Sequence, residues 1–218
     1  MDYKQDILRS NALFFIGLFL YCFIGLAFIQ YYGKEPLHLL INNNYNVIFD
    51  VFFKYFSKFG PLIFIVSIIY IVIKKEKYKA LFILLTSYIL NFLIVTVVKK
   101  AFFIHIHRPT YYFSQKGIDL HLIDGVTSQI PFTFPSGHTS EAFLLMLFIC
   151  LIFDKKWIKI SAIIIAVIMA YSRVYLSKHF LIDTIGGGIL GVVVLVTVFY
   201  LYQNKNSKLL NQYIIKIR

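Results

Sequence analysis

Long apolar runs separated by short polar segments constrain this 218-residue chain more than any other feature of its sequence. Hydrophobic residues make up 59% of the chain and charged residues only 15%, which excludes an ordinary soluble domain, whose surface would carry more charge. A helix that crosses the hydrocarbon core of a bilayer needs about 20 apolar residues. We therefore expect an integral-membrane protein with a single domain over residues 1–218.

Six apolar runs approach this length and predict an all-α fold, a bundle of six transmembrane helices. The predicted spans are approximately 11–32, 58–73, 79–104, 137–153, 157–175 and 181–202. The second run is short, unless residues 47–59 extend it or form a slanted helix at the membrane interface. Phenylalanines recur at helical spacing in this stretch, which suits either an aromatic face against the headgroups or a helix-packing surface.

Basic residues outnumber acidic ones, with a formal net charge of +12. Such a balance can indicate nucleic-acid binding, but here the basic residues fall in clusters between apolar runs, so we expect no nucleic-acid partner. Thirteen of the 22 lysines and arginines lie on the side of the predicted bundle that holds both termini. The positive-inside rule then predicts cytoplasmic termini, with the segments 33–57, 108–136 and 176–180 on the outer side.

The tetrapeptide Pro135-Ser136-Gly137-His138 lies where a loop enters the fourth predicted span. Ser136 is a suitable N-cap, and the free backbone N–H groups at such a helix start bind anions. Gly137 allows a phosphate group to approach the backbone closely. His138 is then placed to give a proton to a departing oxygen.

A second group of polar residues joins the fifth and sixth predicted spans. Arg173 ends the fifth span, His179 opens the sixth, and Asp183 follows four residues later. Positions four apart share a helix face, so the Asp183 carboxylate is expected to accept a hydrogen bond from one imidazole nitrogen of His179. The other nitrogen would then be free to attack phosphorus.

These residues, read with Arg108-Pro109 and the lysines before it, resemble the three-part signature of the type 2 phosphatidic acid phosphatase superfamily. The second and third parts are Pro135-Ser136-Gly137-His138 and Ser172-Arg173-x5-His179-x3-Asp183. The resemblance extends over most of the chain, because the six-span layout is that of the family's integral-membrane branch. It implies a metal-independent reaction with no cofactor, in which His179 forms a phosphohistidine, Asp183 orients it, and His138 serves as acid and then base.

The resemblance also implies a set of residues that hold the phosphate oxygens: Lys100, Arg108, Ser136, Gly137 and Arg173. One spacing departs from the family pattern, because seven residues rather than six separate Lys100 from Arg108. Either the third span unwinds before Arg108, or the identity of the phosphate-binding lysine is open, with Lys99 as the alternative to Lys100.

Several other residues have weaker signals. Glu141 follows His138 by three positions, and we hypothesise that it pairs with Lys99 or Lys100, or keeps His138 protonated. His105 and His107 form a His-x-His pair without a third metal ligand nearby. The glycines of the sixth span are expected to permit close helix packing rather than to bind phosphate: Gly186, Gly187, Gly188 and Gly191.

The resulting hypothesis is a phosphatase of envelope lipids at the outer face of a bacterial inner membrane. The resemblance names undecaprenyl diphosphate, lipid A, phosphatidylglycerophosphate and phosphatidic acid as candidate substrates, and the sequence does not choose among them. No obligate protein partner is expected. The family's fold is shared with vanadium haloperoxidases, but membrane spans argue against that chemistry. The alternative from another class is a protein that binds or transports lipid phosphates without catalysis.

Overall fold

The computed structural model describes residues 6–73, 78–126 and 132–203. The regular elements of these ranges are helices, and an isolated antiparallel bridge joins His107 to Phe132. The helices are α1 (Ile7–Ser10), α2 (Ala12–Tyr32), α3 (Lys34–Asn43), α4 (Val47–Phe56), α5 (Phe59–Ile73), α6 (Tyr78–Ala101), α7 (Pro109–Ser114), α8 (Gly137–Ile152), α9 (Lys156–Tyr175) and α10 (Leu181–Gln203).

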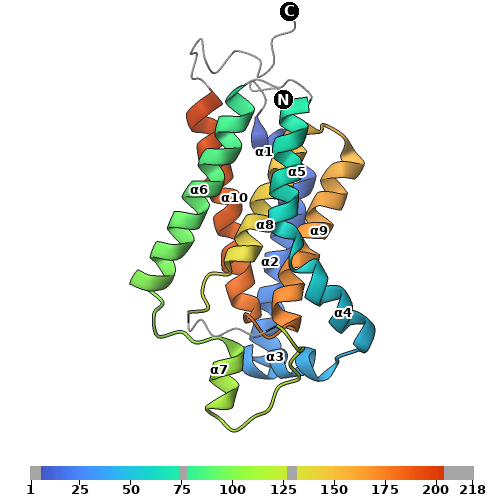
Figure 1. Cartoon of the computed structure of the whole chain (residues 1–218), viewed down its shortest axis with the longest axis vertical. Helices are drawn as coiled ribbons and strands as arrows, with labels where there is room; N and C mark the ends of the chain where they lie inside the picture. Colours follow the sequence, from blue (N-terminus) through green and yellow to red (C-terminus); the bar gives the residue numbers. More distant parts are fainter. Residues whose placement is uncertain (1–5, 74–77, 127–131, 204–218) are drawn as a thin grey trace, which may run out of the picture.

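Six helices run roughly along one axis and form a bundle around α8 (Figure 1). Helix α8 packs against α5, α6, α9 and α10, and most of its side chains are buried. The beginning of α1 and the end of α10 lie at one end of the bundle, while α3 and α7 lie at the other end. The arrangement therefore separates the chain ends from the polar connections that carry the motifs.

The six bundle helices match the six predicted spans in position, but not all of them are long enough to cross a membrane. Four helices meet the length and composition of a span, namely α2, α6, α9 and α10, and the bent pair of α4 and α5 can form a fifth. Helix α8 has 16 residues, or about 24 Å, which is short of the roughly 30 Å hydrocarbon core. The prediction of six full spans is therefore not confirmed.

The stretch before the second predicted span forms a separate helix. Helix α4 makes an angle of 46° with α5, so it does not extend that span in a straight line. Its phenylalanines divide between the two predicted roles, because Phe53 is buried against Tyr171 and Tyr175 of α9, whereas Phe49 and Phe52 are exposed. Residue 59 falls where side chains are not described.

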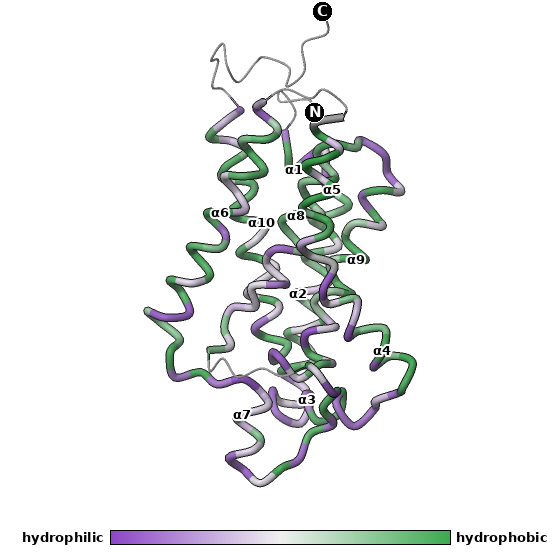
Figure 2. Tube along the Cα trace, viewed as in Figure 1, coloured by the Kyte–Doolittle hydropathy of each residue, from purple (hydrophilic) through white to green (hydrophobic). Residues whose placement is uncertain are grey.

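Hydropathy follows the same division along the bundle (Figure 2). The helices are apolar along most of their length, and polar residues gather at the end that holds α3 and α7. Helix α2 exposes large apolar side chains such as Phe19 and Phe23, which suits a surface in contact with lipid tails.

The glycines of α10 allow this helix to lie directly against α8. A Cβ atom added at Gly187 would clash with the carbonyl oxygen of Ser136, and one at Gly191 would clash with the carbonyl oxygen of Ser140. Only glycine permits such a close approach of two helices. The predicted packing role of these glycines is confirmed, and its consequence is that the start of α10 meets the start of α8.

Candidate active site

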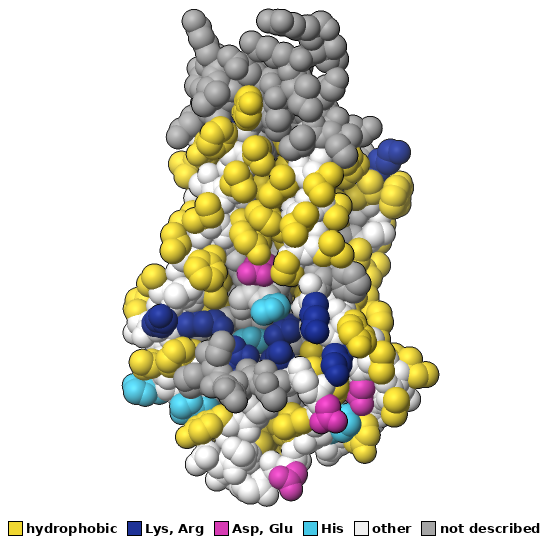
Figure 3. All heavy atoms as spheres, in the orientation of Figure 1, with side chains coloured by type: hydrophobic (Ala, Val, Ile, Leu, Met, Phe, Trp, Pro, Cys, Tyr) yellow, Lys and Arg dark blue, Asp and Glu magenta, His cyan; other side chains and the backbone are white. Residues whose placement is uncertain are grey.

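A polar cavity opens on the side of the bundle where α6 and α9 end and α8 begins. It has a volume of about 490 Å³ and contains nearly all the residues that the motifs predicted. Its charged and histidine side chains are Lys99, Lys100, Arg108, His138, Glu141, Arg173, Lys178 and His179. Figure 3 shows Lys and Arg side chains gathered around histidine on one face of the molecule, below a region that is mostly hydrophobic.

His179 lies in the turn between α9 and α10, and its side chain is 1% exposed. Its Nδ1 atom lies 3.1 Å from the hydroxyl of Thr133, and that hydroxyl donates to Oδ2 of Asp183 over 2.5 Å. Because the single hydroxyl proton of Thr133 goes to Asp183, the oxygen can accept the Nδ1–H of His179. This chain of bonds fixes the imidazole and leaves Nε2 free.

The expected direct hydrogen bond between His179 and Asp183 is replaced by this relay. The two side chains approach only to 3.5 Å, because α10 begins at Leu181 and His179 precedes the helix. Asp183 instead also accepts the backbone N–H of Phe180 over 2.8 Å. Thr133 carries no motif signal in the sequence, and only the folding of its loop onto α10 reveals its role.

Burial and neighbouring cations hold the pKa of His179 well below its usual value. Burial is the largest cause, and the charges of Arg108, Lys99 and Arg173 act in the same direction. The imidazole is therefore neutral near pH 7, as an attacking nitrogen must be.

The start of α8 fits anion binding through its backbone rather than through a side-chain cap. Ser136 is the N-cap residue, but its side chain makes no capping hydrogen bond, and its hydroxyl accepts one from Thr139 over 3.0 Å. The N–H of Ser136 donates to the carbonyl oxygen of Asp183 over 2.9 Å, which ties α8 to α10. The first N–H groups inside the helix, from Gly137 onward, have no intrahelical acceptor.

His138 follows this helix start, and its side chain is exposed toward the cavity. His138 and His179 thus line the same cavity from two different connections of the bundle. The sequence predicted that His138 and His179 lie at helix ends. In the fold they line one cavity with Arg173, which is buried, with 3% of its surface exposed.

The two lysines at the end of α6 differ in position although both line the cavity. Lys99 is half-buried and its charge acts on His179, whereas Lys100 is exposed. Helix α6 ends at Ala101 rather than near residue 104, so the chain leaves the helix before Arg108. The extra residue in the lysine-to-arginine spacing is therefore absorbed in a non-helical segment.

The weaker candidates of the sequence have other roles or none at the site. Glu141 lines the cavity but forms no ion pair with Lys99 or Lys100 in the described part of the chain, and its alternative role, keeping His138 protonated, stays a prediction. No group of three His, Cys, Asp or Glu side chains suited to a metal occurs among the described residues. The ring of His107 instead lies at a tilt against the ring of Tyr111, with 4.5 Å between the ring centroids.

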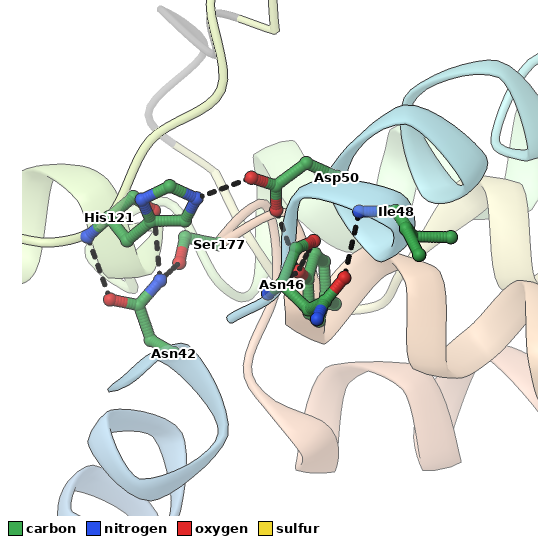
Figure 4. Close-up of polar contacts among 7 residues, drawn as sticks. Asn42, Asn46, Ile48, Asp50, His121 and Ser177 are labelled. Atoms are coloured by element: carbon green, nitrogen blue, oxygen red, sulfur yellow. Dashed lines mark hydrogen bonds and ion pairs between the residues drawn. The ribbon is translucent and has the colours of Figure 1, made fainter. Parts of the chain in front are cut away.

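A polar network, which no motif indicated, supports the turn before His179 (Figure 4). The hydroxyl of Ser177 lies 3.1 Å from Nε2 of His38 and accepts an N–H from Asn42 over 3.1 Å. Asn42 also binds the backbone of His121, whose ring pairs with Asp50 at 2.9 Å. Ser177 has a φ of 51°, so these bonds hold a non-glycine residue in a conformation that costs free energy.

Comparisons with known proteins agree with this arrangement. The model of the PAP2 superfamily matches residues 80–207. Phosphatidylglycerophosphatase B of Bacillus subtilis is 37% identical over 87 residues, which cover 36% of this chain and 41% of that protein. The lipid A 4'-phosphatase of Porphyromonas gingivalis is 26% identical over 181 residues, covering 80% of this chain and 75% of that protein.

A solved structure shares the fold. The crystal structure of Aquifex aeolicus LpxE matches with a TM-score of 0.61 at 25% sequence identity, covering 77% of this chain and 94% of that protein. The similarity thus extends beyond the motif segments to the arrangement of the helices.

Proposed function

The chain belongs to the PAP2 superfamily, and from this premise we propose that it is a lipid phosphatase that removes a phosphate group without a metal ion. The observation that carries the proposal is that His138, His179 and Arg173 line one cavity of an apolar helix bundle. A substrate anchored in the bilayer can reach this cavity by lateral diffusion, because apolar side chains of α6, Phe92 and Val95, form part of its wall. The similar proteins named as phosphatases of lipid A and phosphatidylglycerophosphate support the same substrate class.

In the first step, Nε2 of His179 attacks phosphorus and the bond between phosphorus and the leaving oxygen breaks. Thr133 and Asp183 keep the Nδ1–H in place and stabilise the positive charge that develops on the ring. His138 gives its proton to the leaving oxygen, which departs as an alcohol or as a protonated phosphate. The enzyme then carries a phosphohistidine.

In the second step, a water molecule attacks the phosphohistidine and His138, now neutral, accepts a proton from that water. Inorganic phosphate leaves, and His179 returns to its neutral form. Through both steps the guanidinium groups of Arg108 and Arg173, with Lys99 and the N–H groups at the start of α8, stabilise the negative charge on the phosphate oxygens. We favour Lys99 over Lys100 because its charge reaches His179.

We further propose that the site faces the outside of a bacterial inner membrane and that both termini are cytoplasmic. The support is the distribution of positive charge along the sequence, because 13 of the 22 lysines and arginines fall in the segments predicted to lie on the side of both termini. Candidate substrates are then envelope lipids exposed on the outer leaflet, such as undecaprenyl diphosphate, lipid A or phosphatidylglycerophosphate.

The test is phosphate release by the purified protein in detergent with EDTA, from undecaprenyl diphosphate, lipid A, phosphatidylglycerophosphate and phosphatidic acid. We expect release that EDTA does not inhibit and that falls to background in His179→Ala. A folded protein that releases no phosphate but binds these lipids, with binding retained in His179→Ala, would instead support a non-catalytic binding role.

A further inference from the structure

A second, smaller cavity of about 240 Å³ adjoins the catalytic cavity. The two cavities share three lining residues: His138, Arg173 and Lys178. The rest of the smaller cavity comes from Lys54 in the last turn of α4, from Lys58 in the α4–α5 connection, and from the loop at Gly125 and Val126. No motif in the sequence points to this cavity, because its walls come from four separate segments.

The smaller cavity is strongly positive. Three lysines and one arginine line it, and no described residue of its lining is acidic. Lys54 donates to the carbonyl oxygen of Asp124 over 2.6 Å, a bond that leaves its full charge in place. Burial is the largest cause that lowers the pKa of Lys178, to about 8, and the charges of Arg173, Arg108 and Lys58 act in the same direction. Such a concave cluster favours an anion.

The shared residues determine where the smaller cavity lies relative to the reaction. His138, which faces the leaving oxygen in the proposed mechanism, lines both cavities. The nucleophile His179 and the oxygen-binding Lys99 and Arg108 line only the larger one. A group that occupies the smaller cavity would therefore lie next to His138, the proposed proton donor to the leaving oxygen, and next to Arg173, which also lines both cavities.

We propose that the smaller cavity binds a second phosphate group, which belongs to the leaving part of the lipid. This inference rests on the proposed function and narrows its substrate class to lipids whose leaving group is itself anionic close to the leaving oxygen. A lipid diphosphate satisfies this most directly, and a phosphodiester a few bonds away shares the same chemistry. A water molecule occupies roughly 30 Å³ in the liquid, so the cavity has room for a phosphate group with water around it.

With a diphosphate, the reaction balances as follows. Nε2 of His179 attacks the terminal phosphorus, and the bond to the bridging oxygen breaks. The bridging oxygen keeps the electron pair and takes the proton of His138, so that a lipid monophosphate leaves. Lys58 and Lys178 would stabilise the negative charge of this leaving phosphate both before and during bond cleavage.

The test compares matched substrates with one and two phosphate groups in Lys58→Gln, Lys178→Gln and the double variant. Undecaprenyl diphosphate is paired with undecaprenyl phosphate, and phosphatidylglycerophosphate with phosphatidic acid. The readout is the ratio of kcat/KM for the two members of a pair. We expect each single change to lower the undecaprenyl ratio about tenfold, and a parallel fall in the second pair would identify a phosphodiester as a further ligand.

Lys156→Gln, at the opposite end of the bundle, is the matched charge control and should leave both ratios unchanged. Since Lys178 also lines the catalytic cavity, Lys58→Gln decides the question, because Lys58 lines only the smaller one. Equal losses on both members of each pair, or no loss in Lys58→Gln, would overturn the inference while the proposed function stands.

A binding measurement separates the failure of this inference from the failure of the proposed function. Inorganic pyrophosphate and orthophosphate are added to His179→Ala protein, and thermal unfolding reports their binding. We expect pyrophosphate to raise the unfolding temperature more than orthophosphate does, and the difference to vanish when Lys58→Gln is added. Equal stabilisation by the two anions would overturn the inference even if no lipid were turned over.

Discussion

The two sides of the catalytic cavity are held in different ways. On the side of the nucleophile, Thr133, His179 and Asp183 are all at most 1% exposed and joined by short hydrogen bonds. On the side of the lysines, Lys99 is half-buried, Lys100 is exposed, and α6 ends directly after them. The difference suits the two requirements of the proposed reaction. An attacking atom needs a fixed position, whereas a positive charge acts over a distance and can be supplied by a more exposed side chain.

The largest effect on catalysis is expected when the hydrogen bonds of Thr133 with His179 and Asp183 are removed. Thr133→Val keeps the shape of the side chain but removes the hydroxyl between His179 and Asp183. We expect kcat to fall about a hundredfold, or roughly 2.7 kcal/mol in the barrier. Single-turnover measurements on the fastest lipid would show it, and Thr133→Ser, which retains the hydroxyl, should recover most of the rate. A Val variant as fast as wild type would remove Thr133 from the relay.

The next effect concerns the close contact between the start of α10 and the start of α8. Gly187→Ala would push a methyl group into the carbonyl oxygen of Ser136, and we expect a loss of about 1–3 kcal/mol in stability. Gly188→Ala is the matched control, since its methyl group would meet the ring of Phe143 at 3.2 Å, and a ring can shift more easily than backbone. Thermal unfolding in detergent compares them, and equal destabilisation would contradict the close α8–α10 contact.

A smaller effect on kcat/KM is expected to distinguish Lys99 from Lys100, the two lysines at the end of α6. Lys99→Gln should lower kcat/KM about tenfold, and Lys100→Gln less than about threefold, because Lys99 is half-buried and its charge acts on His179, whereas Lys100 is exposed to solvent. Phosphate release at several lipid concentrations measures both. A larger loss in Lys100→Gln would restore the lysine that the family spacing favours.

The smallest effect is a pH dependence of protein stability that arises from His38, which contacts Ser177 in the turn before His179. Burial lowers the pKa of His38 to about 4, against the opposing charge of Asp183. Because the folded pKa lies below the unfolded value near 6.5, this group's contribution to stability is fully present above pH 6.5 and is lost as the pH falls toward 4. Between pH 6.5 and 5.5 the loss is roughly 1 kcal/mol. His38→Gln should lose less stability over that interval, and an unchanged slope would show that His38 is not buried as described.

Hydropathy predicted the positions of the six bundle helices to within a few residues, because apolar length is a property of local sequence. It could not show that α8 is too short for a full span or that α4 bends away from α5, since these depend on packing. The motif residues and the family were also predictable, because helix starts, paired histidines and their spacing are local signals.

The parts that the sequence did not predict are contacts between distant segments. Thr133 lies 46 residues before His179, in a loop without a pattern, and the partners of His38 and His121 come from elsewhere in the chain. The end of α6 at Ala101, which decides how Lys99 faces the cavity, follows from tertiary structure rather than from helix propensity. The groups that we propose to react were thus chosen from the sequence, while the groups that position them became visible only in the fold.

The central claim is that His179 carries the phosphoryl group between the two steps. The most direct test is to mix the protein with a lipid substrate labelled with ³²P in the departing phosphate, to stop the reaction at alkaline pH, and to locate the label by proteolysis and mass spectrometry. The account predicts an acid-labile label on His179 that is absent in His179→Ala and less abundant in Thr133→Val. Continued phosphate release with no label on the protein, or a label on His138 instead, would contradict it.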